Sequence, residues 1–369
     1  MTIPQIEIQL VAAVVAVACA LPGVFLVLRR MALMSDAISH AILLGIVLAF
    51  FATEDLSSPL LIFGAAATGV LTVALVELLS RTRLVREDAA IGLVFPVLFS
   101  IGVILIARFA DDVHLDADVV LLGELAFTPF DRFVVAGYDL GPRALWVMLG
   151  ILVLDLAFVA LLYKELKLAT FDAALAAALG FSPALLHYAL MGLVSITAVG
   201  AFDAVGSVLV VALMIAPPAS AYLLTDRLPR MIGLSALFGV LSAMTGYWVA
   251  HWLDASIAGA MATMAGALFV LAFLLAPERG LLAQARRRAR LRLEFAQTML
   301  AIHLLNHEGR PEAAEECQAE RLDQHLRWRP EFVRRVIGRA EQRGLLRQSE
   351  GLLLLTDRGR QMARQAILQ

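Results

Sequence analysis

Nine apolar segments occupy the first three quarters of this chain, and each is long enough to cross a lipid bilayer. They run near residues 6–28, 32–53, 59–79, 90–107, 143–163, 184–201, 204–224, 230–252 and 257–276. A membrane-spanning helix needs about 20 mainly apolar residues, and only a helix or a closed barrel satisfies its backbone amides in lipid. The pattern therefore predicts an all-α polytopic membrane bundle of about nine transmembrane helices.

The charge distribution divides the chain into a membrane domain and a basic tail. Only 17% of the residues are charged, against about 25% in a soluble domain. Residues 280–369 carry 17 Arg and 11 acidic residues, whereas the remainder carries 13 basic and 21 acidic residues. We predict a transmembrane domain at 1–279, a basic juxtamembrane linker at 280–290 and a soluble domain at 291–369.

Basic residues fall in alternate loops, which orients the bundle. These loops contain Arg29, Arg30, Arg81, Arg83, Arg86, Lys164, Lys167, Arg227, Arg230 and Arg279, followed by the cluster Arg286, Arg287, Arg288 and Arg290. Because Lys and Arg are retained on the cytoplasmic side, the N-terminus is predicted outside and the C-terminal domain in the cytoplasm. The acid-rich loop 108–142 is predicted on the outer face.

An aspartate and a histidine stand four residues apart in the second segment, within RRMALMSDAISHAILLG. A helix places Asp36 and His40 on one face, one turn apart. A carboxylate at the centre of a span costs about 2.5–3.5 kcal/mol on insertion scales, so it needs a partner or a function. Carboxylate oxygen with imidazole nitrogen suits a divalent transition metal. The pair favours contact with a metal ion in transit; an Asp–His hydrogen bond that pins two helices is the alternative.

Two protein ligands are too few to hold an ion, so other polar residues in the apolar segments are candidates. Asp155 lies near the middle of the fifth segment, and Asp203 lies where glycines interrupt the sixth and seventh segments. Intramembrane carboxylates usually face the bundle interior, and an interrupted helix can offer carbonyl oxygens to an ion. We predict further metal ligands or gate residues here, with an interhelical hydrogen bond for Asp155 and a helix cap for Asp203 as alternatives. The sixth and seventh segments are either two helices or one broken helix plus another.

The loop between the fifth and sixth segments reads LKLATFDAALAAALGFSP, residues 166–183. Asp172 can cap a short helix that runs through Leu179, and Gly180 can end it in a left-handed turn. Pro183 then begins the next span. A short capped helix on the inner face is suited to docking a cytosolic motor, and an ordinary helical connector is the alternative.

Three separated segments are similar to those of the membrane permeases of manganese, zinc and iron ABC importers, the ABC-3 type. They are RRMALMSDAISHAILLG, LKLATFDAALAAALGFSP and FDAVGSVLVVALMIAPPASAYLL at residues 202–224. The resemblance covers roughly residues 5–278, and three segments in the right order are far more specific than the Asp–His pair alone. It implies the fold of a vitamin-B12-importer-like type II ABC permease.

The resemblance also implies cargo, partners and site residues. The cargo would be Mn²⁺, with Zn²⁺ or Fe²⁺ as alternatives, moved by alternating access with no permanently bound cofactor. The partners would be cytosolic ABC ATPase subunits, an extracytoplasmic metal-binding protein, a second permease chain in a homodimer or heterodimer, and the lipid of a bacterial plasma (inner) membrane. Asp36 and His40 map onto metal-path residues. The ATPase-coupling helix maps onto Phe171, Asp172, Leu175, Leu179 and Gly180.

The chain contains no G-x-x-x-x-G-K-[ST] sequence, the loop with which a Walker site cradles nucleotide phosphates. ATP hydrolysis is therefore predicted in a partner chain. We predict a transporter subunit rather than an enzyme.

Residues 291–369 show helices followed by a hairpin and a last helix. Helices are predicted at 291–306, at 312–326 and from Pro330 to about Arg343. Two strands with a turn at Glu350–Gly351 follow, and a last helix begins at residue 357. This order, with the ending LTDRGRQMA, resembles the DNA-binding part of diphtheria-toxin-repressor-type metalloregulators. The resemblance implies a small cytoplasmic α+β winged-helix domain.

In such domains the helix before the hairpin enters the major groove. The possible nucleic-acid face consists of Arg334, Arg335, Arg339 and Arg343. Glu331 and Glu341 lie on the same helix, and a tail tethered to a membrane has little access to DNA. Nucleic acid is therefore not favoured as a partner, and a regulatory or dimerising role is preferred.

Several residues of the tail could instead form a metal-sensing cluster. They are His303, His307, Glu308, Glu315, Glu316 and Cys317. A hydrated acidic run without a ligand is the alternative.

Two other functions compete with metal import. A membrane-tethered transcription regulator would use the bundle as sensor and the tail as output. A permease for metal chelates would need a roomy path without an ion-coordinating Asp–His pair.

Overall fold

The computed structural model describes residues 2–54, 58, 60–109, 125–135, 138–349 and 351–368. The chain divides into two compact units, Met1–Gly280 and Leu281–Gln369. This boundary lies one residue after the predicted end of the transmembrane domain.

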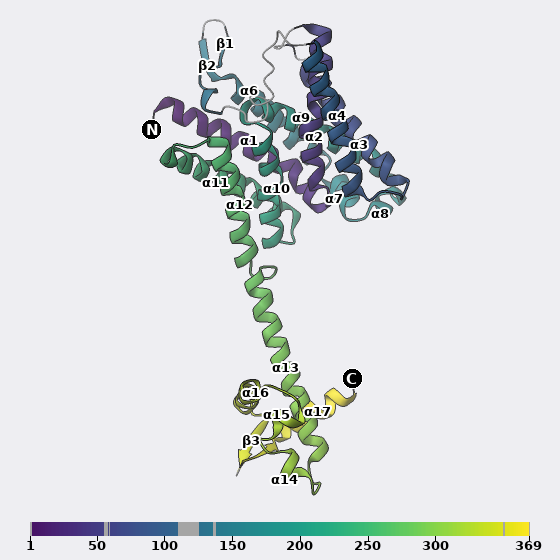
Figure 1. Ribbon diagram of the computed structural model, residues 1–369, viewed down its shortest axis with the longest axis vertical. Helices are drawn as coiled ribbons and strands as arrows, with labels where there is room; N and C mark the ends of the chain where they lie inside the picture. Colours follow the sequence, from purple (N-terminus) through teal and green to yellow (C-terminus); the bar gives the residue numbers. More distant parts are fainter. Residues whose placement is uncertain are drawn as a thin grey trace. The chain divides into compact units, whose positions relative to one another are not determined.

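The first unit is a helical bundle (Figure 1). Its long helices are α1 (Ile3–Leu28), α2 (Ala32–Thr53), α3 (Leu60–Arg81), α4 (Glu87–Phe109), α6 (Arg143–Leu161), α9 (Pro183–Val205), α10 (Ser207–Leu224), α11 (Leu228–Leu253) and α12 (Ile257–Leu275). Within the described residues, nine helices are long and apolar enough to cross a membrane. The predicted membrane bundle is therefore confirmed.

Helices α1 and α2 form the centre of the bundle. Helix α1 packs against α6, α9, α10 and α11, while α2 packs against α3, α4, α9 and α10. The largest side chains without accessible surface include Phe25 of α1 and Ile38 of α2. The central position of α2 places the predicted metal-path residues against several other spans.

The sixth and seventh segments are two helices separated by a single residue. Gly206 has φ 78° and ψ 162°, so it breaks the helical path between α9 and α10. A positive φ is readily adopted by glycine because it has no Cβ. This finding resolves the alternative that the sequence left open.

Close helix contacts in the bundle depend on glycine. A Cβ built on Gly45 of α2 would lie 2.2 Å from the carbonyl oxygen of Gly64 on α3. Conversely, a Cβ on Gly64 would lie 2.6 Å from the carbonyl oxygen of Gly45. Small residues at such crossings let membrane helices approach closely, so this pair sets the distance between α2 and α3.

Gly45→Val is expected to destabilise the bundle, because the new side chain collides with backbone that cannot rotate away. Overpacking of this kind costs about 1–3 kcal/mol. The matched control is Gly150→Val in α6, where an added Cβ would meet no described atom within 4 Å. Thermal unfolding in detergent should show a lower Tm for the first variant only; equal Tm values would contradict the assigned crossing.

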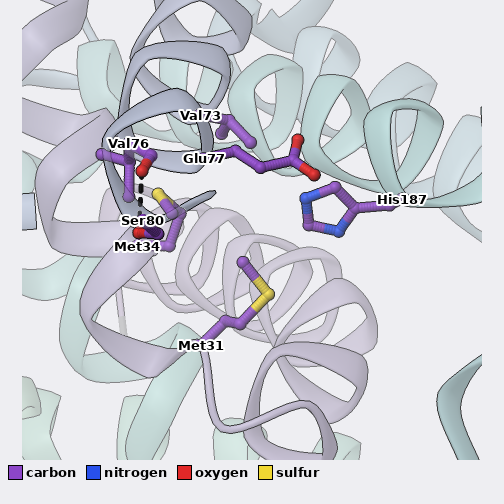
Figure 2. A pocket seen from close by; sticks show the side chains of 7 residues that line it. All are labelled: Met31, Met34, Val73, Val76, Glu77, Ser80 and His187. Carbon is purple, nitrogen blue, oxygen red and sulfur yellow. Dashed lines mark hydrogen bonds between the residues drawn. The ribbon is translucent and has the colours of Figure 1, made fainter. Parts of the chain in front are cut away.

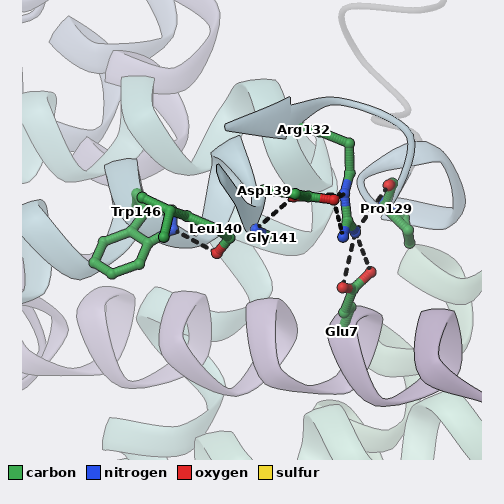
Figure 3. Close-up of polar contacts among 7 residues, drawn as sticks. All are labelled: Glu7, Pro129, Arg132, Asp139, Leu140, Gly141 and Trp146. Atoms are coloured by element: carbon green, nitrogen blue, oxygen red, sulfur yellow. Dashed lines mark hydrogen bonds and ion pairs between the residues drawn. The ribbon is translucent and has the colours of Figure 1, made fainter. Parts of the chain in front are cut away.

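On the side predicted to be outside, a short hairpin joins β1 (Arg132–Val135) and β2 (Tyr138–Pro142), after the 3-10 turn η1 (Leu125–Phe127). Residues 110–124 of the predicted acidic loop lie outside the described part. Arg132 ties the hairpin together and to α1 (Figure 3): its Nη1 donates to Glu7 Oε1 at 2.8 Å, and its Nε donates to Asp139 Oδ2 at 2.8 Å. The sequence did not predict this hairpin.

The second unit contains the predicted order of helices, hairpin and helix. Its elements are α13 (Leu281–His307), α14 (Ala313–Glu316), α15 (Leu322–His325), α16 (Pro330–Gln342), β3 (Leu346–Ser349), β4 (Leu352–Leu355) and α17 (Asp357–Leu368). The strands pair antiparallel, with Leu346 opposite Leu355. Side chains from all three longer helices and both strands share one apolar core, which includes Leu300, Val336, Leu353 and Ala363.

Two details of this unit differ from the sequence-based expectation. The segment predicted as a linker, 280–290, is almost entirely the first part of α13, and the helix predicted at 312–326 is divided into α14 and α15. Between these short helices, Gln318 bridges to Leu352 of the hairpin. This strand-like contact interrupts the helix.

Candidate functional site

Asp36 and His40 lie together on α2. His40 Nε2 is 3.5 Å from Asp36 Oδ1, and the two side chains keep 30% and 42% of their surface accessible in the single chain. The residues between them, Ala37, Ile38 and Ser39, are buried. The pair therefore lies on a partly accessible face of α2, next to a buried face of the same helix.

The His40 ring also meets an aromatic wall on α4. Its centroid lies 5.8 Å from that of Phe95, in a stacked arrangement, and 5.9 Å from that of Phe99, edge to face. These contacts limit the rotation of the imidazole. They orient it without consuming either ring nitrogen, so a nitrogen stays available to bind an ion.

Asp155 is placed differently. It has no accessible surface, and the hydroxyl of Thr197 on α9 lies 3.0 Å and 3.1 Å from its two carboxylate oxygens. The side chain therefore joins α6 to α9 by an interhelical hydrogen bond. In this arrangement a passing ion has no access to it.

Asp203 is exposed in the last turn of α9, three residues before the break at Gly206. Asp203 therefore remains a candidate metal ligand, because its carboxylate is exposed and the helix is interrupted nearby. The structure thus leaves Asp203 accessible and buries Asp155 completely.

A cavity of about 260 Å³ opens beside the first turn of α2 (Figure 2). Its lining consists of Met31, Met34, Val73, Val76, Glu77, Ser80 and His187. In Figure 2 the Glu77 carboxylate points toward the His187 ring. The sequence analysis did not single out Glu77 or His187. The available signal was that each is a polar, ionisable side chain near the end of an apolar span.

Neighbouring groups already engage both ionisable residues of this cavity. Arg81 Nη2 donates to Glu77 Oε1 at 2.7 Å, and the hydroxyl of Tyr188 donates to Glu77 Oε2. Arg29 Nη1 lies 3.5 Å from His187 Nδ1. A fixed guanidinium beside the imidazole disfavours a bound dication, because like charges repel strongly at partly buried sites.

Arg29 also connects the end of α1 to α7 (Tyr163–Phe171), the helix that precedes the predicted coupling segment. Its Nε donates to the hydroxyl oxygen of Thr170 at 3.2 Å. Burial lowers the pKa of the Arg29 guanidinium from its ordinary value. This half-buried arginine holds the end of α1 against α7.

The predicted coupling segment is a short capped helix, α8 (Ala173–Ala178). The Asp172 carboxylate accepts the backbone N–H of Leu175 at 2.9 Å, which is the expected N-cap. Leu179 follows as the C-cap, and Gly180 adopts φ +87°. The helix is one residue shorter than predicted, with the capping and the left-handed turn as expected.

An apolar surface surrounds this helix. Phe171 is 61% exposed, Leu175 47% and Leu179 61%. Ala176, the neighbour of Leu175 on α8, is buried. Exposed large apolar side chains gathered on a capped helix are typical of a docking site.

The arginines of the possible nucleic-acid face divide into two groups. Arg334, Arg335 and Arg339 are exposed on α16. Arg343 instead donates to Gln297 Oε1 at 2.9 Å and to Glu294 Oε1 at 3.1 Å on α13. Arg343 is thus engaged by α13 although it stays exposed, and Arg334, Arg335 and Arg339 remain on the accessible face of α16.

Comparisons with known proteins agree with this geometry. Residues 6–276 match the sequence profile of the ABC 3 transport family. The zinc transport system membrane protein TroD of Treponema pallidum (strain Nichols) is 48% identical over 357 residues, covering 97% of this chain and 97% of the relative. The manganese transport system membrane protein MntD of Bacillus subtilis (strain 168) is 50% identical over 282 residues, covering 76% and 95%.

A solved structure shares the fold. PsaBC from Streptococcus pneumoniae in complex with Fab matches with a TM-score of 0.64 and 28% identity, over 76% of this chain and 94% of that chain. The family profile covers the whole bundle, and the two relatives exceed 30% identity over nearly their full length. The chain therefore belongs to the ABC 3 transport family and is a membrane permease subunit of an ABC importer.

Proposed function

We propose that this permease moves a divalent transition-metal ion across the membrane by alternating access, with Asp36 and His40 as transient ligands. The observation that carries the proposal is an acid and an imidazole 3.5 Å apart on an accessible helix face. An oxygen and a nitrogen donor bind Mn²⁺, Fe²⁺ and Zn²⁺ alike. The two relatives are named for zinc and for manganese transport, which supports this class of cargo without choosing within it.

The small number of protein ligands favours transient binding of the ion during transport over stable binding. Two protein ligands leave most of the coordination sphere to water or to another chain. A second permease chain presenting its own Asp36–His40 pair, or the equivalent pair of a different chain, would complete the site. Asp203, exposed beside the Gly206 break, is the remaining candidate ligand within this chain.

The surfaces of the bundle suit two further partners. The apolar surface of Phe171, Leu175 and Leu179 would dock a cytosolic ABC ATPase, which supplies the energy. On the opposite side, Phe130 is 78% exposed and Tyr138 is 75% exposed beside the hairpin. Such aromatic side chains suit a protein interface, and we assign this one to an extracytoplasmic metal-binding protein. In this arrangement the N-terminus is outside and the second unit lies in the cytoplasm.

The test is metal accumulation in bacteria that lack their own manganese and zinc importers and express the chain with its ATPase and binding protein. Mass spectrometry of washed cells should show ATPase-dependent accumulation of Mn²⁺ or Zn²⁺, and a hydrolysis-deficient ATPase serves as the control. Accumulation of a metal chelate but of no free ion would overturn the proposal. A regulator would instead change transcription without changing cellular metal.

A further inference from the structure

Three potential metal ligands converge in the second unit. His303 and His307 lie one turn apart on α13, with ring centroids 4.7 Å apart. Glu316 lies at the end of α14. One ligand atom from each of the three residues lies within 4.8 Å of the others, and all three side chains are half-buried. Two imidazoles and a carboxylate from two separate elements therefore face a common point.

One of these donors is buried without a partner. His307 Nδ1 has no hydrogen-bond partner among the residues that the structure describes. Leaving a buried polar atom unsatisfied costs about 1–3 kcal/mol. A metal ion bound to the imidazole would remove this penalty.

The other two donors are held in place by neighbouring groups. His303 Nε2 lies 3.0 Å from the backbone carbonyl oxygen of Glu316, which fixes α14 against α13. His325 Nδ1, on α15, lies 2.9 Å from Glu316 Oε2. A carboxylate oriented by a second imidazole is the usual arrangement around a metal ligand.

The neighbouring acidic and thiol groups are engaged elsewhere. Glu308 accepts three hydrogen bonds from Arg360, and Glu315 pairs with Arg321. Cys317 is buried in the apolar core of the second unit, where it packs among aliphatic side chains. The structure thus selects three of the six residues that the sequence singled out.

We propose that His303, His307 and Glu316 form a binding site for a divalent transition metal, with His325 orienting the Glu316 carboxylate. Two nitrogen donors and one oxygen donor suit Zn²⁺, Co²⁺ or Fe²⁺, whereas Ca²⁺ and Mg²⁺ require oxygen ligands. Metal–ligand bonds of about 2.0–2.2 Å require the side chains to close inward by small rotations. Three protein ligands leave a position for water, so the bound ion can exchange.

This site belongs to the second unit and the proposed transport ligands belong to the first, so its existence does not rest on the proposed function. If the permease carries such ions, the second unit samples the same class of ion that the bundle delivers. Metal binding would join α13 to α14 and stabilise the unit by mass action. The site is therefore suited to report the metal concentration to the permease.

The experiment uses the full chain in lipid nanodiscs, in the His40→Ala background to remove the path ligand. Zn²⁺ retained after gel filtration is counted by mass spectrometry, and Co²⁺ serves as a probe because its visible spectrum reports coordination by nitrogen and oxygen. We expect about one ion per chain, lost on His307→Gln and on His303→Ala. His325→Ala should weaken binding about 10-fold to 100-fold, as expected for an orienting residue.

Matched controls separate this site from adventitious binding. His251→Ala removes an exposed histidine of α11, and Glu315→Gln removes the acidic residue next to Glu316; both should retain the ion. In the chain that carries only His40→Ala, Zn²⁺ should also protect His303 and His307 from chemical modification. This readout leaves the second unit unmutated, so it does not depend on whether a His303 or His307 variant folds. Binding that survives His307→Gln, or the absence of both retained metal and protection, would overturn the proposal. Loss of uptake on His40→Ala affects only the proposed function.

Discussion

Replacing His40 by alanine is expected to abolish metal uptake while the permease still assembles with its ATPase. His40 supplies the nitrogen donor of the Asp36–His40 pair. Its ring packs against the rings of Phe95 and Phe99. Losing about 3 kcal/mol of ion stabilisation at the barrier slows transport about 100-fold. The initial rate of cellular metal accumulation measures this loss, and copurification of the ATPase measures assembly.

Asp36→Asn should give a similar defect, because it keeps the size of the side chain and removes the charge that attracts the dication. Two matched controls lie at the C-terminal end of α11: His251→Ala, and Asp254→Asn at a position with φ 50° that asparagine tolerates. Both should leave uptake near the wild-type rate. Normal uptake in His40→Ala or in Asp36→Asn would remove that residue from the path.

Leu175→Glu combined with Leu179→Glu is expected to detach the ATPase and stop transport. Both side chains are exposed in the single chain, at 47% and 61%, so a carboxylate there costs little folding stability. In an apolar interface, however, each buried unpaired charge is strongly unfavourable, and a loss of about 4 kcal/mol weakens association nearly 1000-fold. Affinity purification of the tagged permease should recover the ATPase with the wild-type chain and lose it with the double variant.

The matched control for this variant is Leu140→Glu in β2 of the hairpin, where the side chain is 44% exposed. It places a carboxylate on an apolar surface away from α8 and should retain the ATPase. The Tm of the purified permease should match the wild type for both variants. Retention of the ATPase by the double variant, with normal transport, would contradict the docking role of α8.

Much of the bundle was predictable because one physical rule dominates it. Any segment of about 20 apolar residues in lipid must become a helix, and the predicted segments agree with the observed helices within a few residues. The break at Gly206 was harder to interpret, because one residue with φ 78° separates two helices without any polar run to mark it. The two ends of α8 were predictable because aspartate is preferred at a helix N-cap and glycine is preferred in the left-handed turn after a helix.

The parts that depend on distant partners were not predictable. Asp155 and Thr197 are 42 positions apart, so the sequence offered no means of choosing between a ligand and a helix contact. Glu308 is paired with Arg360, 52 positions away, which removes it from the histidine cluster. The hairpin at 132–142 also escaped prediction. It depends on Arg132 reaching Glu7 of α1, 125 positions earlier.

Helix α1 is fastened at both of its ends. Near its start, Glu7 accepts hydrogen bonds from Arg132 of the hairpin; just after its end, Arg29 donates to Thr170 of α7. Its 26 residues span about 39 Å at 1.5 Å per residue, which is the thickness of a bilayer with part of its headgroups. Because one helix carries both contacts, we expect a displacement of the hairpin to reach α7 through α1. A partner bound at the hairpin and a partner bound at α8 would then influence each other without acting through the ion itself.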